Sequence, residues 1–329
     1  MEAKEYTYSS LGGDRPLAAD VYFDGKPGGS PGDVRPIVDR DLPQRQLIDY
    51  TVLVIYGGGF VSGSKSSVSK ARLESLALDF GFVVVVPNYR HCPTVSLHDG
   101  PIRDVHDCYS WARQDLPKLL SEDAGVAVSG QNIAVIGSSA GGLLALHLGS
   151  ARPPPKAIVA YFPALYLDDE FWRTPMESLS KIPTFPPEFL NQVMQEGIVV
   201  DAPPSFKRVP ESTVPVPDLA RPRVAWFLSH LRDGTWLRNV VQDDDYARVD
   251  PAELFSPEFP PTCFVHGTHD KICLPRFSKQ AYDTLQSFNV PSKLLVVEGK
   301  GHDFENGVGV NDALFATIQD SHRFVAEHV

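Results

Sequence analysis

The sequence lacks any long uninterrupted apolar run. Its purely apolar runs, such as residues 82–86, are far shorter than the roughly 20 residues that a membrane-spanning helix needs. The chain also begins with charged residues and not with the apolar stretch of a secretion signal. These absences predict a cytoplasmic protein without a membrane span.

Basic charge is also scarce. The chain carries 30 Lys and Arg against 41 Asp and Glu, a net charge of −11. No stripe of basic residues is present that could neutralise a row of phosphates. We therefore expect no nucleic-acid partner.

Cysteine is rare, and its four copies show no metal-ligand spacing. Two of them lie in or beside apolar segments, which favours core packing in a reducing compartment. The four residues are Cys92, Cys108, Cys263 and Cys273. No metal site is expected.

The sequence does contain a regular alternation of short β-forming apolar runs and amphipathic helical patterns. This alternation predicts parallel strands joined by right-handed helical crossovers. An N-terminal strand pair at 5–9 and 17–23 precedes it, followed by a Pro-, Gly- and Asp-rich loop at about 25–45. We expect a single domain over residues 1–329, with a mostly parallel central sheet flanked by helices. The predicted strands are 51–56, 82–86, 133–136, 157–162, 262–266 and 292–298, and the predicted helices include 68–80 and 102–112.

The alternation stops between about residues 165 and 255, where prolines and aromatic residues are scattered without a clear period. An insertion of this length between two core strands should lie near the carboxyl ends of the strands and cover a site there. We expect a lid with short helices at 187–195 and 223–231. Trp226 and Trp236 of this lid, together with Phe60, are candidates for substrate contact. For any single aromatic residue, a place in the lid's own core is the commoner outcome.

Residues 137–141 read Gly-Ser-Ser-Ala-Gly and join the apolar run 133–136 to another at 143–148. That order predicts a strand, a sharp turn and a helix. A serine at such a turn is lifted out of the sheet, and the glycines on either side remove Cβ atoms that would block the close approach. The bare pattern also occurs by chance. Ser139 is thus a candidate nucleophile that needs partners.

Two residues downstream fit the partners of a serine nucleophile, which are a general base and an acid that orients it. Asp270 follows the predicted strand 262–266, and His302 follows the predicted strand 292–298. The order Ser, Asp, His is that of the α/β-hydrolases and differs from the chymotrypsin and subtilisin orders. Alone, a loop Asp is usually a turn former and a single His a surface or core residue. With the serine turn, they predict a catalytic triad of Ser139, Asp270 and His302.

Three consecutive glycines, residues 57–59, follow the predicted strand 51–56 and precede Phe60. Glycines leave backbone N–H groups accessible, so this loop is suited to bind an oxyanion. A simple chain reversal is the alternative. A phosphate cradle ranks low, because no Gly-Lys-Ser/Thr follows at the right spacing.

Together these motifs resemble the hormone-sensitive-lipase-like branch of the α/β-hydrolase family, which includes microbial esterases and plant carboxylesterases. The likeness extends over most of the chain. Residues 56–60 are similar to the family's His-Gly-Gly-Gly motif, 87–93 to its Asp-Tyr-Arg-Leu-Ala-Pro segment, and 137–142 to its Gly-Asp-Ser-Ala-Gly-Gly turn. His266-Gly267-Thr268 with Asp270, and then Gly301-His302, complete the match.

The resemblance implies an α/β-hydrolase fold with a lid, a triad of the three residues above, and often a homodimer. It also implies an oxyanion hole formed by the N–H groups of Gly58, Gly59 and Ala140. The chain departs from the family at several supporting positions. Tyr56 replaces the usual His, Ser138 replaces the usual Asp, and Asn88 with His91-Cys92 alters the second motif.

These features predict a serine hydrolase that cleaves carboxylic esters of small to medium apolar substrates through an acyl-enzyme on Ser139. The substrate would be a small-molecule ester or thioester, and no metal or organic cofactor is needed. One alternative is acyl transfer to an alcohol, including intramolecular lactone formation, because the same triad serves both reactions. Another alternative is a non-catalytic receptor that binds a small molecule on the same fold.

Overall fold

The computed structural model describes residues 1–11, 14–24, 47–48, 50–202, 206–207 and 216–329. The loop predicted at 25–45 lies outside these residues. Among the described residues, no helix combines the length and the apolar character needed to cross a membrane.

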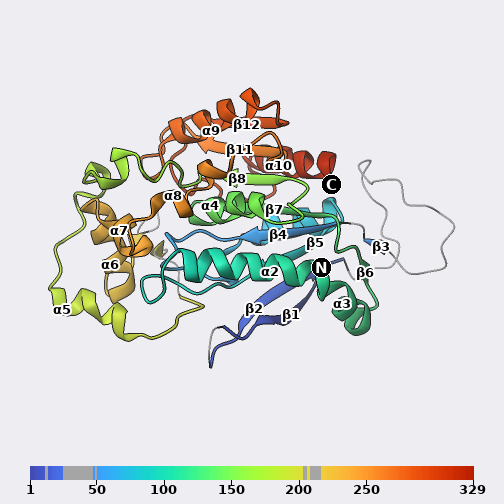
Figure 1. Cartoon of the computed structure of the whole chain (residues 1–329), viewed down its shortest axis with the longest axis horizontal. Coiled ribbons are helices and arrows are strands. Elements are labelled where there is room, and N and C mark those ends of the chain that lie inside the picture. Colours follow the sequence, from blue (N-terminus) through green and yellow to red (C-terminus); the bar gives the residue numbers. More distant parts are fainter. Residues whose placement is uncertain (12–13, 25–46, 49, 203–205, 208–215) are drawn as a thin grey trace.

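A central sheet of eight strands, in the order β1-β2-β5-β4-β7-β8-β11-β12, forms the framework of the protein (Figure 1). β1 pairs antiparallel with β2, and β2 pairs antiparallel with β5. All other neighbours in this sheet are parallel, which confirms the mostly parallel sheet expected from the sequence. The strands are β1 (Glu2–Ser9), β2 (Leu17–Phe23), β4 (Thr51–Ile55), β5 (Val83–Pro87), β7 (Ile133–Ser138), β8 (Ile158–Tyr161), β11 (Thr262–Gly267) and β12 (Ser292–Val297). Two short pairs lie outside it, β3 (Leu47–Ile48) with β6 (Ala127–Val128) and β9 (Phe206–Lys207) with β10 (Val216–Pro217).

Helices cover both faces of the sheet, and strand β5 shows why. Its valines alternate between two apolar clusters, with Val83 and Val85 in one and Val84 and Val86 in the other. Apolar residues of α2, α4 and α9 belong to the first cluster. Leu73 of α1 and Phe324 and Val325 of α10 belong to the second. The α-helices of the described chain are α1 (Lys70–Glu74), α2 (Arg103–Gln114), α3 (Leu116–Ala124), α4 (Ala140–His147), α5 (Pro187–Leu190), α6 (Pro222–Arg232), α7 (Trp236–Val241), α8 (Tyr246–Val249), α9 (Pro275–Ser287) and α10 (Phe315–His328).

Short 3₁₀-helical and π-helical turns extend several of these helices or lie in the connections between strands. The helix predicted at 68–80 is α1 followed by the π-helix η2 (Ser75–Asp79). A second π-helical turn, η3 (His98–Ile102), precedes α2. The 3₁₀ turns are η1 (Lys65–Ser67), η4 (Leu148–Ser150), η5 (Glu170–Arg173), η6 (Glu177–Leu179), η7 (Asn191–Gln195) and η8 (Pro251–Leu254).

The segment 165–255 connects β8 to β11, which are neighbours in the sheet. Its helices α5, α6 and α7 gather at one end of the molecule, away from the C-terminus (Figure 1). The helix predicted at 187–195 is present as α5 and η7, and the one predicted at 223–231 as α6. The segment reaches the sheet at the carboxyl end of β4, where the Trp236 indole N–H donates a hydrogen bond to the Gly59 carbonyl.

Candidate active site

Ser139 stands on a strained turn between β7 and α4. Its backbone adopts φ 55° and ψ −121°, a conformation that L-residues rarely occupy. The neighbouring glycines make this possible, because a Cβ at Gly137 would lie 1.9 Å from the Gly141 carbonyl oxygen, and one at Gly141 would lie 2.3 Å from the Ile55 oxygen. The strand, turn and helix expected from the sequence are therefore present.

The three predicted catalytic residues form one hydrogen-bonded chain. Ser139 Oγ lies 2.9 Å from His302 Nε2, and His302 Nδ1 lies 2.8 Å from Asp270 Oδ2. Because a carboxylate only accepts hydrogen bonds, Nδ1 of a neutral His302 carries the proton. The lone pair of Nε2 then faces the serine hydroxyl, which is the tautomer that accepts a proton from it.

Asp270 is held in place by several donors. Its Oδ1 accepts hydrogen bonds from the N–H groups of Ile272 at 2.8 Å and Cys273 at 3.0 Å. The Nε2 atom of His266, a buried residue, lies 3.3 Å from Oδ2. Burial raises the pKa of Asp270, but the hydrogen bonds from His266 and His302 outweigh it and hold this pKa well below its ordinary value. Asp270 is therefore a carboxylate that keeps the His302 ring in one orientation.

His302 lies among aromatic and acidic neighbours. The ring of Phe162 lies 4.7 Å from the imidazole, and Asp303 Oδ1 lies 3.8 Å from Nε2. Burial lowers the pKa of His302, but the Asp303 charge, the hydrogen bond to Asp270 and the Glu305 charge raise it to about 9. The imidazolium form is therefore stabilised in this site.

The glycine loop, residues 57–60, faces the serine turn. Gly58 and Gly59 have φ of 108° and 62°, a region that favours glycine. In the described part of the chain, the backbone N–H groups of Gly58, Gly59 and Ala140 donate no hydrogen bond. These three N–H groups are the ones that the family resemblance assigns to the oxyanion hole.

The aromatic residues predicted to contact substrate are all buried. Phe60 is fully buried, and its ring stacks on Trp236 with centroids 5.7 Å apart. Trp226 packs against His230, with ring centroids 4.4 Å apart. Trp236 thus contacts the glycine loop through Phe60. A role of Phe60, Trp226 or Trp236 in substrate binding stays a prediction.

Behind the glycine loop lies a buried pair that the sequence reasoning missed. The Tyr56 hydroxyl and His91 Nε2 are 3.0 Å apart, and the Tyr56 ring stacks on Tyr89 at 4.5 Å. Burial and the nearby Arg223 charge lower the pKa of His91 to about 3, so its ring is neutral. The imidazole that the family carries at position 56 has a counterpart at position 91. The sequence contained an indication of this pair, because Tyr56 and His91 both differ from the residues of the family motifs.

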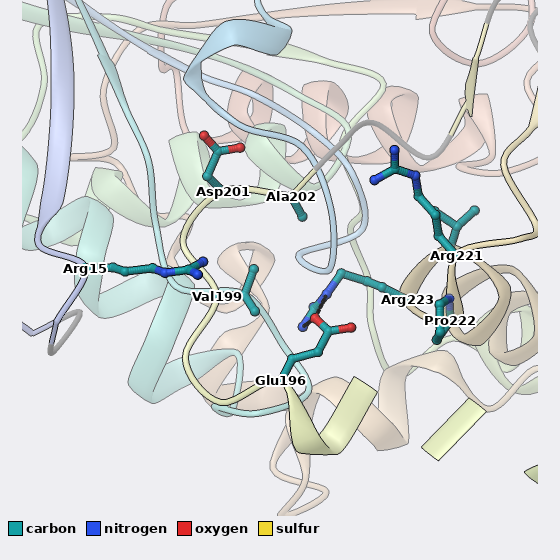
Figure 2. A pocket seen from close by; sticks show the side chains of 9 residues that line it. Arg15, Glu196, Val199, Asp201, Ala202, Arg221, Pro222 and Arg223 are labelled. Carbon is teal, nitrogen blue, oxygen red and sulfur yellow. Dashed lines mark hydrogen bonds and ion pairs between the residues drawn. The ribbon is translucent and has the colours of Figure 1, made fainter. Parts of the chain in front are cut away.

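A cavity of about 410 Å³ lies beside this region (Figure 2). It is lined by Arg15, Glu196, Val199, Asp201, Ala202, Arg221, Pro222, Arg223 and Val224. Arg223 links this cavity to the chain that follows the glycine loop, because its Nη1 donates hydrogen bonds to the carbonyls of Val61 and Cys92. None of the three predicted catalytic residues lines it, so it is separate from the site at Ser139.

The four cysteines are buried thiols, as their apolar surroundings in the sequence suggested. Within the described residues, no cluster of three or more His, Cys, Asp or Glu side chains has the arrangement of a metal site.

Comparisons with known protein families agree with this geometry. Residues 52–203 match a model of an α/β-hydrolase fold family, and residues 198–329 match the prolyl oligopeptidase family. Among solved structures, an α/β-hydrolase superfamily protein from Enterococcus faecalis is 18% identical, with a TM-score of 0.66, and the match covers 99% of both chains. An esterase from Pyrobaculum calidifontis is 19% identical, with a TM-score of 0.64, over 99% of this chain and 85% of the esterase.

Among proteins of known function, the chain is similar to much longer ones. It is 28% identical to the non-reducing polyketide synthase ausA of Emericella nidulans, over 95% of this chain but only 13% of the synthase. The chain thus spans about one eighth of the length of that relative. The eight-stranded sheet, the serine turn and the match of residues 52–203 show that the chain has the α/β-hydrolase fold.

Proposed function

We propose that the protein is a serine hydrolase that cleaves carboxylic esters of small to medium apolar substrates. The observation that carries this proposal is the continuous hydrogen-bonded chain from Ser139 through His302 to Asp270 at the strand-to-helix turn. A nucleophile, a general base and an acid that orients the base, each within hydrogen-bonding distance of the next, are the groups that acyl transfer through serine requires.

The proposed reaction begins when Ser139 Oγ attacks the carbonyl carbon of the substrate and His302 Nε2 takes the hydroxyl proton. The N–H groups of Gly58, Gly59 and Ala140 stabilise the oxyanion that forms on the carbonyl oxygen. As the intermediate collapses, His302 returns the proton to the leaving alcohol, and the acyl group remains on Ser139. Water then attacks this acyl-enzyme with His302 again as the base. The bond from the acyl carbon to Ser139 Oγ breaks, His302 returns the proton to Oγ, and the carboxylic acid leaves. Asp270 keeps the imidazole oriented and stabilises its charged form.

A covering segment fits this chemistry, because an acyl-enzyme must be protected from unwanted acceptors. We propose that residues 165–255 form the lid. Its support is the contact of this segment with the glycine loop, where a Cβ at Gly59 would lie 2.1 Å from the Phe227 ring and where Trp236 bonds to the Gly59 carbonyl.

A second candidate is transfer of an acyl group from a thioester, with release by water or by a hydroxyl of the product. Serine nucleophiles attack thioesters as well as esters, and release to an internal hydroxyl gives a lactone. The similarity of nearly the whole chain to a segment of a polyketide synthase favours this candidate. The triad chemistry is the same in both cases, and only the leaving group and the acceptor differ.

The nucleophile is tested by labelling with a serine-directed phosphonate followed by peptide mass spectrometry. We expect the added mass on the peptide that contains Ser139 and none in the Ser139→Ala variant. A folded protein that binds small molecules but takes no label would support the non-catalytic receptor instead.

The acyl donor and acceptor are tested with two matched substrates that share one acyl chain. One is a p-nitrophenyl ester and the other an N-acetylcysteamine thioester, both assayed over a series of chain lengths. Product analysis in the presence of an added alcohol separates hydrolysis from transfer. A clearly higher kcat/KM for the thioester, or ester products instead of free acid, would replace the first candidate by the second.

A further inference from the structure

A buried polar cluster lies directly behind the serine turn, on the face of the sheet covered by α1 and α10. Its centre is Arg72 of α1, whose side chain is only 6% exposed. Arg72 Nη1 donates a hydrogen bond of 3.1 Å to Ser138 Oγ, and its guanidinium lies over the Tyr161 ring at 4.3 Å. Ser138 is the residue immediately before Ser139.

The second attachment of Arg72 leads to the loop that carries His302. Arg72 Nη2 lies 3.8 Å from Oε1 of Glu305, whose side chain is also 6% exposed. Glu305 follows His302 by three residues. One side chain therefore joins the peptide before the nucleophile to the loop that carries its hydrogen-bond partner.

Several polar atoms of this buried cluster lack a hydrogen-bond partner within the described chain. Among the described residues, Arg72 Nε and Nη2, Glu305 Oε2 and Nε2 of the neighbouring His322 make no hydrogen bond. Buried polar groups with unmet hydrogen bonds cost stability, and a buried ion pair is often no better than apolar residues of the same size. A contribution to stability alone is therefore a weak explanation for this arrangement.

We propose that Arg72 and Glu305 are positioning residues for the reaction, which set the relative placement of Ser139 and His302 by joining their two loops. Neither side chain contacts a reacting atom, so both act through Ser138 and the His302 loop. This inference rests on the proposed function. The groups that face Glu305 are Arg72 from α1, Asp303 of its own loop and the Ser138 hydroxyl of β7, and His322 of α10 faces Arg72.

The main test is Glu305→Gln, which keeps the shape of the side chain and removes its charge. We expect kcat for a short-chain ester to fall on the order of 10- to 100-fold, because small displacements of reacting groups have effects of this size. KM should change little, since the substrate loses no contact. The comparison is made at high pH, where His302 is neutral in both proteins. Glu327→Gln, which removes an exposed carboxylate of α10, is the matched control and should match the unmodified protein.

A second readout needs no substrate. The Nδ1 proton between His302 and Asp270 gives a downfield proton resonance in NMR spectra, and its pH titration reports on His302. Because the Glu305 charge raises the pKa of His302, Glu305→Gln should shift the resonance and lower its titration midpoint. Glu327→Gln should do neither.

If Glu305→Gln does not fold, the double variant Arg72→Met with Glu305→Leu takes its place. Replacing both partners by apolar residues commonly preserves folding. This variant should keep its melting temperature close to that of the unmodified protein while showing the same loss of kcat.

Unchanged kcat in a folded variant would overturn the positioning role, whether or not the His302 resonance shifts. If the unmodified protein hydrolyses no ester and takes no phosphonate label, the proposed function fails. The positioning role in catalysis then fails with it, and the resonance comparison shows only whether Glu305 is coupled to His302.

Discussion

The two adjacent serines of the turn make different contacts. Ser139 Oγ faces His302, whereas Ser138 Oγ accepts a hydrogen bond from Arg72. We expect Ser139→Ala to fold normally and to lose ester turnover by a factor on the order of 10⁴ or more, as removal of a triad member does. Ser138→Ala should retain far more activity. Steady-state kinetics of both variants check this, and swapped behaviour of the two, or full activity of both, would exclude Ser139 as the nucleophile.

The acidic surroundings of His302 determine the pH at which it works as a base. Only the neutral imidazole accepts the serine proton, so a pKa raised from 6.5 to about 9 moves the rising limb of kcat/KM to alkaline pH. Asp303→Asn should move this limb to lower pH, because it removes the carboxylate 3.8 Å from Nε2. The matched control is Asp283→Asn, an exposed carboxylate paired with Lys279. If the rising limb of kcat/KM does not move in Asp303→Asn, the Asp303 charge does not affect the pKa of His302.

At the level of elements, the glycine loop after β4 depends on α7. Trp236 stacks on Phe60 and donates a 3.2 Å hydrogen bond to the Gly59 carbonyl. Trp236→Phe keeps an aromatic ring but removes the donor, so we expect kcat to fall about tenfold as the loop loses its alignment. Trp111→Phe is the control, because the buried Trp111 ring of α2 packs against Tyr6 and Tyr8 of β1. A change confined to KM would instead support the substrate contact predicted for Trp236.

At the level of the whole molecule, the site couples stability to pH. The folded-state pKa of His302 is raised, so its stabilisation is fully present below pH 6.5 and is lost as pH rises through about 9. Asp270 acts in the opposite direction, since its lowered pKa stabilises the fold above pH 3.8 and is lost as pH falls below it. We expect the free energy of unfolding to drop by on the order of 1–3 kcal/mol between pH 6.5 and 9.5. Denaturant unfolding at both pH values measures it, and His302→Gln should lose less over that range.

The strands, the serine turn and the triad residues could be predicted from the sequence, because each depends on residues that are close together in the chain or on the order of the strands. β-branched runs such as 83–86 favour strands through their residue types, and alternation with helices leads to a parallel sheet. The nucleophile turn requires small residues within two positions of Ser139, so it leaves a compact motif. The order of Asp270 and His302 after successive strands follows from the same topology, since the carboxyl ends of parallel strands meet at one edge.

Only the tertiary structure decided which side chains support the site. Tyr56 meets His91 across 35 residues, and Trp236 reaches Gly59 across 177. Arg72 and Glu305 come from a helix and a loop that meet only beneath the folded sheet. Such contacts have no fixed spacing and no period, because the path of the chain between the partners does not limit where they meet. A single sequence therefore specifies the reacting groups at strand ends, whereas the packing that orients them exists only once distant elements are brought together.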